Sequence, residues 1–240
     1  GVYATEGPGD LTPDPDFMRR EPLFQTLYQR GCEIVGAEAT LRLLYPPRVT
    51  GMKSRYNGLT CYGWEESLLP WECVRDFDQH LQWITTMSSY VSRVLIDNGV
   101  SVPIHSVGIG ADHILLTPPD ASRLPAIRQR FKLLHISSCF PRKGVDVLLD
   151  AYARAFSAED DVTLILKTFP NPHHDIETQL AEWRKRRRSA PHVTLINGDL
   201  PDGAVRALYG LADVLVAPSR GEGFGLPMAE AMLHRLPVIT

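Results

Sequence analysis

The sequence lacks the features that would assign it to several common classes of protein. Its 240 residues carry 25 Lys and Arg against 28 Asp and Glu, a formal net charge of -3. Because nucleic-acid binding by counterion release requires a broad basic surface, this balance gives no reason to expect a nucleic-acid partner. No apolar run approaches the roughly 18 residues that a membrane-spanning helix needs. We therefore expect any contact with a membrane to be peripheral.

Cysteine is scarce, and the four cysteines are Cys32, Cys61, Cys73 and Cys139. They form no close pair and no Cys/His spacing typical of a metal site, so we expect reduced thiols in a cytosolic protein. His173 and His174 have no third ligand at useful spacing, and no Asp-x-Asp motif lies near a plausible site. The sequence therefore predicts neither a metal site nor another cofactor.

The second half of the chain alternates short β-rich runs with helical stretches. With 44% apolar residues over 240 positions, two modest domains are expected. The pattern predicts strands at 131–137, 162–167, 193–197 and 214–217, and helices at 145–156, 176–188 and 204–211. This is the rhythm of a parallel, doubly wound α/β sheet.

The first half is harder to interpret. Strands are predicted at 83–88 and 103–107 with a helix at 90–98 between them, whereas residues 1–48 have only weak periodicity. Residues 116–122 are rich in proline and polar side chains, which suits a linker. We therefore divide the chain into a first domain at 1–115, a linker at 116–130 and a second domain at 131–240.

The most informative segment runs from Gly221 to Met232, where seven residues separate Glu222 from Glu230. Pro227 suits the first position of a helix, so the N–H groups before it would face outward at the positive helix end, where a diphosphate binds well. Glu230, one turn into that helix, can accept hydrogen bonds from two neighbouring hydroxyls such as a ribose diol. The segment thus predicts a site for a phosphorylated, hydroxyl-rich ligand.

With this Glu, seven residues, Glu motif, the chain resembles the retaining glycosyltransferases of family 4, which have the two-domain GT-B fold. The resemblance covers about the last forty residues, through 208–220 before the motif and 237–240 after it. It implies that Glu230 holds the ribose of a nucleotide sugar and that Glu222 meets the hydroxyls of the donor sugar. The further substrate-binding residues that it implies are Gly223, Phe224, Gly225, Leu226 and Ser219.

A second loop, residues 137–144, lies between a predicted strand and a predicted helix and holds the adjacent cations Arg142 and Lys143. An equivalent loop in family 4 neutralises the diphosphate leaving group, and Lys143 followed by Gly144 resembles its pattern. Many members have an arginine earlier in the loop, where this chain has Ser138. The division of labour between Arg142 and Lys143 therefore stays open, and the implied catalytic residues are Glu222, Lys143 and Arg142.

Two acids, Glu65 and Glu66, follow Trp64 in a segment that resembles a Trp-Glu motif of family members that build polysaccharides. Such an acid could orient an acceptor hydroxyl or line the cleft; equally, the segment could be a buried Trp beside a pair of acids that starts a helix. Arg235 stands where relatives usually have a helix-ending glycine, so we expect an altered helix cap and no effect on chemistry.

These inferences together predict part of a longer GT-B enzyme, with both Rossmann-like domains truncated. The implied reaction transfers a hexose from a nucleotide diphosphate sugar to a saccharide or a lipid-linked saccharide, with retention and without a metal, in polysaccharide or glycolipid biosynthesis. Two alternatives remain open: a GT-B sugar-nucleotide epimerase or phosphorylase, and a non-catalytic subunit that binds a nucleotide sugar.

Overall fold

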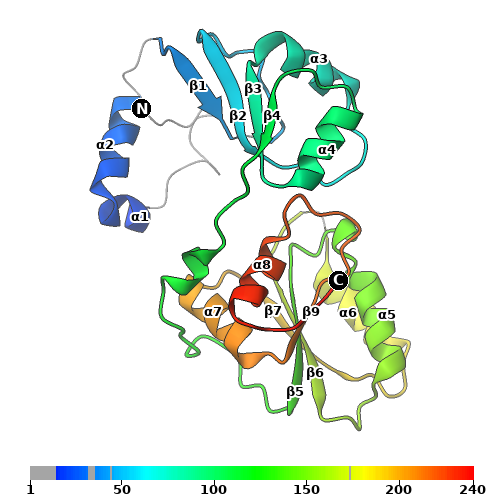
Figure 1. Cartoon of the computed structure of the whole chain (residues 1–240). Helices are drawn as coiled ribbons and strands as arrows, with labels where there is room; N and C mark the ends of the chain where they lie inside the picture. The colour runs from blue at the N-terminus through cyan, green and yellow to red at the C-terminus, as the bar shows by residue number, and fades with distance from the viewer. Residues whose placement is uncertain (1–14, 32–35, 44, 173) are drawn as a thin grey trace.

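The computed structural model describes residues 15–31, 36–43, 45–172 and 174–240, which form two domains joined by an extended stretch of chain (Figure 1). The first domain contains a sheet of order β1-β2-β3-β4, and the second contains a sheet of order β7-β6-β5-β8-β9. Every strand pairing in both sheets is parallel. The predicted α/β class with two parallel, Rossmann-like sheets is confirmed.

In the first domain, the helices of residues 71–80 and 89–97 pack against the four-stranded sheet around a core that includes Phe77, Ile84 and Leu95, whereas the two helices within residues 15–31 lie apart from the sheet (Figure 1). The strands are β1 (Ala39–Arg42), β2 (Tyr56–Tyr62), β3 (Trp83–Thr86) and β4 (Ile104–Ser106), and the helices are α1 (Pro15–Arg20), α2 (Pro22–Gly31), α3 (Trp71–His80) and α4 (Ser89–Asp97). The elements predicted between 83 and 107 are present with ends shifted by one or two residues. Sequence reasoning missed β1, β2 and α3.

The second domain follows the predicted alternation throughout. Its strands are β5 (Phe131–Ile136), β6 (Val162–Thr168), β7 (His192–Asn197), β8 (Val214–Val216) and β9 (Val238–Ile239), and its α-helices are α5 (Val145–Ala155), α6 (Ile176–Lys185), α7 (Asp202–Leu211) and α8 (Leu226–Leu233). Two short 3-10 helices, η1 (Asp112–Leu115) and η2 (Pro141–Lys143), lie in connecting segments.

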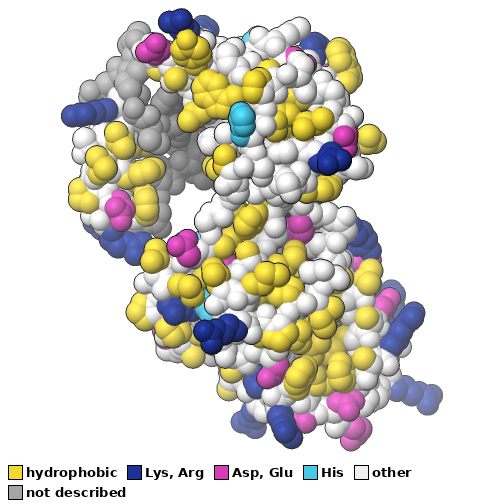
Figure 2. Space-filling model, viewed as in Figure 1, with side chains coloured by type: hydrophobic (Ala, Val, Ile, Leu, Met, Phe, Trp, Pro, Cys, Tyr) yellow, Lys and Arg dark blue, Asp and Glu magenta, His cyan; other side chains and the backbone are white. Residues whose placement is uncertain are grey.

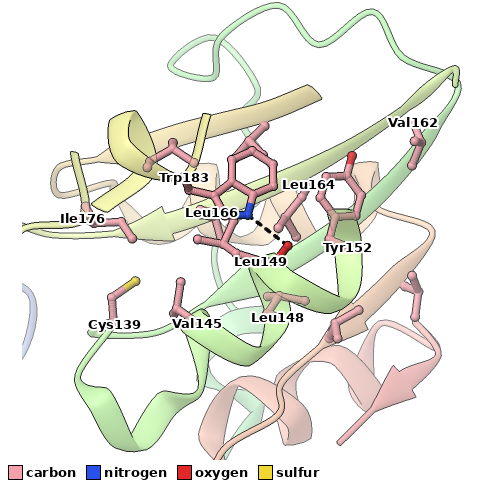
Figure 3. Close-up of a cluster of buried hydrophobic side chains, with 14 residues drawn as sticks. Cys139, Val145, Leu148, Leu149, Tyr152, Val162, Leu164, Leu166, Ile176 and Trp183 are labelled. Carbon is pink, nitrogen blue, oxygen red and sulfur yellow. Dashed lines mark hydrogen bonds between the residues drawn. The ribbon is translucent and has the colours of Figure 1, made fainter. Parts of the chain in front are cut away.

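The interior strand β6 is buried along its whole length, and Leu164, Ile165 and Leu166 form the apolar run at its middle. Leu164 and Leu166 face the cluster formed with α5 and α6, where the Trp183 indole N–H donates to the Leu149 carbonyl at 3.1 Å (Figure 3). Ile165 points to the opposite face, which η1, α7 and α8 cover. Both faces of the sheet are therefore packed, and its carboxyl edge is left for other contacts.

The boundaries of α6 and α8 show how the structure departs from the prediction. Helix α6 ends at Lys185 rather than residue 188, because the Arg187 guanidinium turns back to donate to the Trp183 carbonyl at 3.1 Å. This bond caps a free carbonyl at the helix end. Helix α8 begins at Leu226 after Gly225, so Pro227 is the second helical residue and not the first.

The expected linker, residues 116–130, contains no helix or strand and lies against the second domain rather than between the two. Asp120 N–H donates to the Gly203 carbonyl at 2.8 Å, and the Arg206 side chain donates to the carbonyls of Leu115 and Thr117, each at 2.7 Å. Ile114, in η1, is buried in the core of the second domain. The chain therefore passes from one domain to the other before residue 112.

The surface and the cysteines are consistent with the composition. Lys and Arg side chains are interspersed with acidic and apolar ones on the face shown in Figure 2. Cys61, Cys73 and Cys139 are free thiols, and Cys32 and His173 lie outside the described residues. Within the described ranges, no helix combines the length and apolar character needed to cross a bilayer.

Candidate functional site

Two loops meet at the carboxyl edge of the second sheet. One follows β5, the other follows the neighbouring strand β8, and the chain runs outward from β5 through β6 and β7 before it returns to β8. The sheet therefore reverses its winding between β5 and β8, which is where doubly wound sheets bind ligands. Arg220 N–H donates to the Arg142 carbonyl at 2.7 Å, and a Cβ on Gly144 would lie 2.1 Å from the Pro218 carbonyl oxygen. Gly144 (φ 71°) thus permits this close approach.

Lys143 and Glu222, one from each loop, form an ion pair with Nζ to Oε1 at 2.6 Å. Ser219 Oγ donates to the same carboxylate oxygen at 2.7 Å. The structure therefore brings three of the predicted site residues into one cluster. An anion that arrived here would draw on the Lys143 ammonium, which the protein already holds in place.

The turn before α8 supplies further donors. Gly225 has φ 82° and precedes the first helical residue, Leu226. No described residue accepts a hydrogen bond from the backbone N–H groups of Phe224, Gly225 or Leu226. Free N–H groups at a helix amino terminus are a favourable environment for a negatively charged group.

Glu230 lies on the buried side of α8, apart from the cluster around Glu222. Its Oε2 accepts a 2.6 Å hydrogen bond from the Tyr209 hydroxyl, and its Oε1 is 3.2 Å from His113 Nε2. Burial, followed by the bond to this carboxylate, raises the pKa of Tyr209, so the phenol keeps its proton and donates. Each carboxylate oxygen retains a second lone pair, so the group can still accept from a ligand diol.

His135, which sequence reasoning missed, supports the loop after β5 from below. It is buried, with Nδ1 2.8 Å from the Val216 carbonyl of β8 and Nε2 2.8 Å from Ser137 Oγ. The carbonyl assigns the ring proton to Nδ1, and the neutral Nε2 then accepts from Ser137. Burial lowers the pKa of His135, so the ring stays neutral and fixes the two strands that carry the site.

Arg142 points away from Lys143 and toward the first domain. Its Nη2 donates to Glu65 Oε1 at 3.0 Å, and its Nη1 donates to the Gly221 carbonyl at 3.2 Å. Of the two alternatives left open for Glu65, contact with the cleft between domains is the one that this ion pair supports. Arg142 and Lys143, whose division of labour the sequence left open, therefore bind different partners, Glu65 and Glu222.

The loop at 221–223 also touches the first domain directly. Ser88 Oγ donates to the Gly223 carbonyl, and a Cβ on Gly221 would lie 2.4 Å from the Glu65 carbonyl oxygen. A Cβ on Gly223 would lie 3.1 Å from Met87 Sδ. The glycines of this loop therefore let the two domains approach around it, a requirement that the sequence motif alone did not reveal.

The described residues contain no group of three or more His, Cys, Asp or Glu side chains arranged to hold a metal ion. Among the described residues, the groups available to a ligand at this site are the Lys143 ammonium, the free backbone N–H groups before α8 and the carboxylates of Glu222 and Glu230. That set suits a ligand with both phosphate and hydroxyl groups.

Comparisons with known proteins agree with this geometry. Residues 130–240 match the family model described as Glycosyl transferases group 1. The MMP alpha-(1->4)-mannosyltransferase of Mycolicibacterium hassiacum is 34% identical over 159 residues, which cover 65% of this chain and 36% of that protein. The O-antigen chain mannosyltransferase B of Escherichia coli is 32% identical over 136 residues, which cover 54% of this chain and 34% of that protein. The chain thus spans about a third of the length of these relatives.

Among solved structures, Anabaena Alr3699/HepE in complex with UDP and glucose superposes with a TM-score of 0.63 at 18% identity. The superposition covers 95% of this chain and 64% of the other, so both domains share the GT-B arrangement. The resemblance inferred from the Glu222–Glu230 motif is confirmed. The second domain of this chain, residues 130–240, belongs to the glycosyl transferases group 1 family, and the two domains together have the GT-B fold.

Proposed function

We propose that this chain binds a nucleoside diphosphate hexose and transfers the hexose, with retention, to a hydroxyl of a saccharide or lipid-linked saccharide. One observation carries the proposal: Lys143 and Glu222 come together beside the amino terminus of α8, at the reversal point of the sheet. Mannose is the first donor sugar to test, since the two relatives described above are named as mannosyltransferases. The pathway would be polysaccharide or glycolipid biosynthesis.

In the transfer, the bond between the anomeric carbon and the diphosphate oxygen breaks, and the acceptor hydroxyl oxygen bonds to that carbon. The acceptor proton passes to the departing diphosphate, which leaves as a nucleoside diphosphate. Negative charge grows on the diphosphate as the bond lengthens, and preorganised donors stabilise such charge most effectively. Lys143 and the free N–H groups at 224–226 are those donors, and a metal ion is not required for this role.

The two glutamates hold different parts of the donor. Glu230, already placed by Tyr209, would accept hydrogen bonds from the ribose hydroxyls. Glu222 would meet the hydroxyls of the hexose, with Lys143 released toward the diphosphate as the ligand enters. Ser219 would keep the Glu222 carboxylate in position during this exchange of partners.

Calorimetric titration tests this proposal directly. The wild-type chain is titrated with UDP, GDP, UDP-glucose and GDP-mannose, with and without magnesium. We expect saturable binding of one nucleotide and its sugar without the metal, and loss of about 1–3 kcal/mol of binding free energy in Glu230→Ala. Glu159→Ala, which changes an exposed acid of the same domain, is the matched control.

Saturable binding that Glu230→Ala leaves intact would remove Glu230 from the site. Absence of binding to all four compounds, in a chain whose folding is verified by circular dichroism, would contradict the proposed function.

A further inference from the structure

A pocket of about 560 Å³ lies between the two domains, next to the loop at 221–223. Gly63 and Met87 line it from the first domain, and Phe140 and Arg142 line it from the second. A Cβ on Gly223 would lie 3.6 Å from Gly63 Cα, so the pocket wall adjoins the candidate donor loop. Its volume is within the range of small-molecule sites.

One wall of the pocket is apolar and aromatic. Leu43, Tyr45 and Tyr62 join Met87 and Phe140 in this wall. Tyr62 is buried and packs edge-to-face on Phe77, and its hydroxyl is not exposed to the pocket. Tyr62 therefore contributes aromatic surface to the wall.

The charged groups of the pocket are mainly acidic. Glu65, Glu66 and Arg142 are the charged members of the described lining, and the Arg142 guanidinium is bound to Glu65 at 3.0 Å. Two carboxylates therefore face the pocket with one guanidinium that is already paired. A phosphate group on a ligand would meet this acidic excess without a free cation to compensate it.

We propose that this pocket binds the acceptor and that the acceptor is an uncharged sugar rather than a sugar phosphate. This inference rests on the proposed function and specifies its second substrate. A sugar ring has an apolar C–H face, which suits the wall that Tyr45, Met87 and Phe140 form, and hydroxyl groups at its edge. Glu65 accepts a hydrogen bond from such a hydroxyl, and Arg142 holds the Glu65 carboxylate in the orientation that does so.

Ligand-observed NMR titrations on the wild-type chain test the proposal. The probes are methyl α-D-mannopyranoside and mannose 6-phosphate, each added in the presence of UDP and of GDP. We expect the neutral glycoside to bind about tenfold more tightly than the phosphate, because only the phosphate carries a charge of the disfavoured sign. Equal or tighter binding of the phosphate would overturn the proposal, and so would absence of binding by the glycoside.

The nucleotide titration in the same samples separates the two levels of inference. If a nucleotide binds and mannose 6-phosphate binds more tightly than the glycoside, the proposed function stands and the acceptor class is wrong. If no nucleotide binds, the proposed function itself has failed.

Charge reversal locates the effect in the pocket. Glu66→Lys should narrow the preference for the neutral glycoside about fivefold, because it replaces a repulsive charge by an attractive one. Glu72→Lys makes the same change at an exposed position of α3 outside the pocket lining and should leave the preference within about twofold, since exposed charges at a distance are screened. An equal response of the two variants would show that total charge, not this pocket, sets the preference.

Discussion

Lys143 and Arg142 are adjacent in the loop after β5, yet their ion pairs differ in burial and in the domains that they connect. The Lys143–Glu222 pair closes at 2.6 Å within the second domain, with side-chain exposures of 13% and 22%. The Arg142–Glu65 pair closes at 3.0 Å between the two domains, with exposures of 33% and 37%. One loop thus supplies a cation near the proposed donor site and an arginine that contacts the facing domain. Adjacency in sequence therefore does not imply a shared role.

The largest expected effect comes from removal of the local cation. Lys143→Ala should lower the rate of hexose transfer by about 10²–10³-fold, the usual loss when a preorganised group that stabilises transition-state charge is deleted. Lys185→Ala, at an exposed position of α6, is the matched control and should retain the wild-type rate. Release of nucleoside diphosphate from the donor is the measurement. A Lys143→Ala variant with near wild-type turnover would assign the charge stabilisation to other groups.

Double-mutant cycles on the free energy of unfolding compare the two ion pairs directly. The Lys143–Glu222 pair, being better shielded, should show a coupling energy of about 2 kcal/mol. The Arg142–Glu65 pair is more exposed and should show about 0.5 kcal/mol, after discount for solvent screening. Each cycle requires both alanine variants and their combination, measured by urea denaturation. Equal coupling in the two pairs would remove the distinction drawn here.

The buried ring of His135, which supports the loop that carries Lys143 and Arg142, gives a prediction of how the stability of the fold depends on pH. Burial depresses the pKa of His135 in the folded chain below its ordinary value of 6.5. The unfolded chain therefore binds a proton that the folded chain does not, and stability is complete above pH 6.5 and declines as the pH falls below it. Between pH 7.5 and 5.5 this group should account for about 1 kcal/mol of lost stability.

The variant His135→Asn should reduce that pH dependence, whereas His105→Asn, at an exposed position of β4, should leave it unchanged. Urea denaturation at the two pH values provides the comparison. An unchanged slope in His135→Asn would mean that this ring is not the group whose protonation destabilises the fold.

The smallest expected effect concerns the backbone conformation of Arg235. Arg235 follows α8 with φ 56°, the left-handed conformation that glycine adopts without strain. Arg235→Gly should raise the free energy of unfolding by about 1 kcal/mol and leave transfer unchanged. Thermal denaturation checks the first part and the transfer assay the second; destabilisation would show that the arginine side chain makes a larger contribution than its backbone strain.

The second domain could be predicted from sequence because local signals and tertiary packing agree there. Strand β6 contains the apolar run Leu164–Leu166 because both of its faces are covered, and α5 follows a glycine turn. The first domain gives weaker signals. β1 has only four residues with alternating exposure, and α3 begins after Pro70 without a side-chain cap that would mark its start.

The members of the candidate site could be predicted only where a local sequence pattern marks them. Glu222, Ser219 and Glu230 belong to one motif, and Lys143 follows a strand that ends at the same sheet edge. The partners Tyr209 and His113 approach Glu230 through the packing of α7 and η1, and Glu65 meets Arg142 across 77 positions of sequence. Such contacts depend on how elements and domains pack, which no local pattern encodes.

The central claim is that Lys143 acts in the proposed donor site, whereas Arg142 binds Glu65 of the first domain. Nucleoside diphosphate affinity of Lys143→Ala and of Arg142→Ala, measured side by side by calorimetry against wild type, tests it most directly. The account predicts a loss of at least about tenfold for Lys143→Ala, equal to about 1.4 kcal/mol, and less than about threefold for Arg142→Ala. Equal losses, or a larger loss for Arg142→Ala, would contradict it.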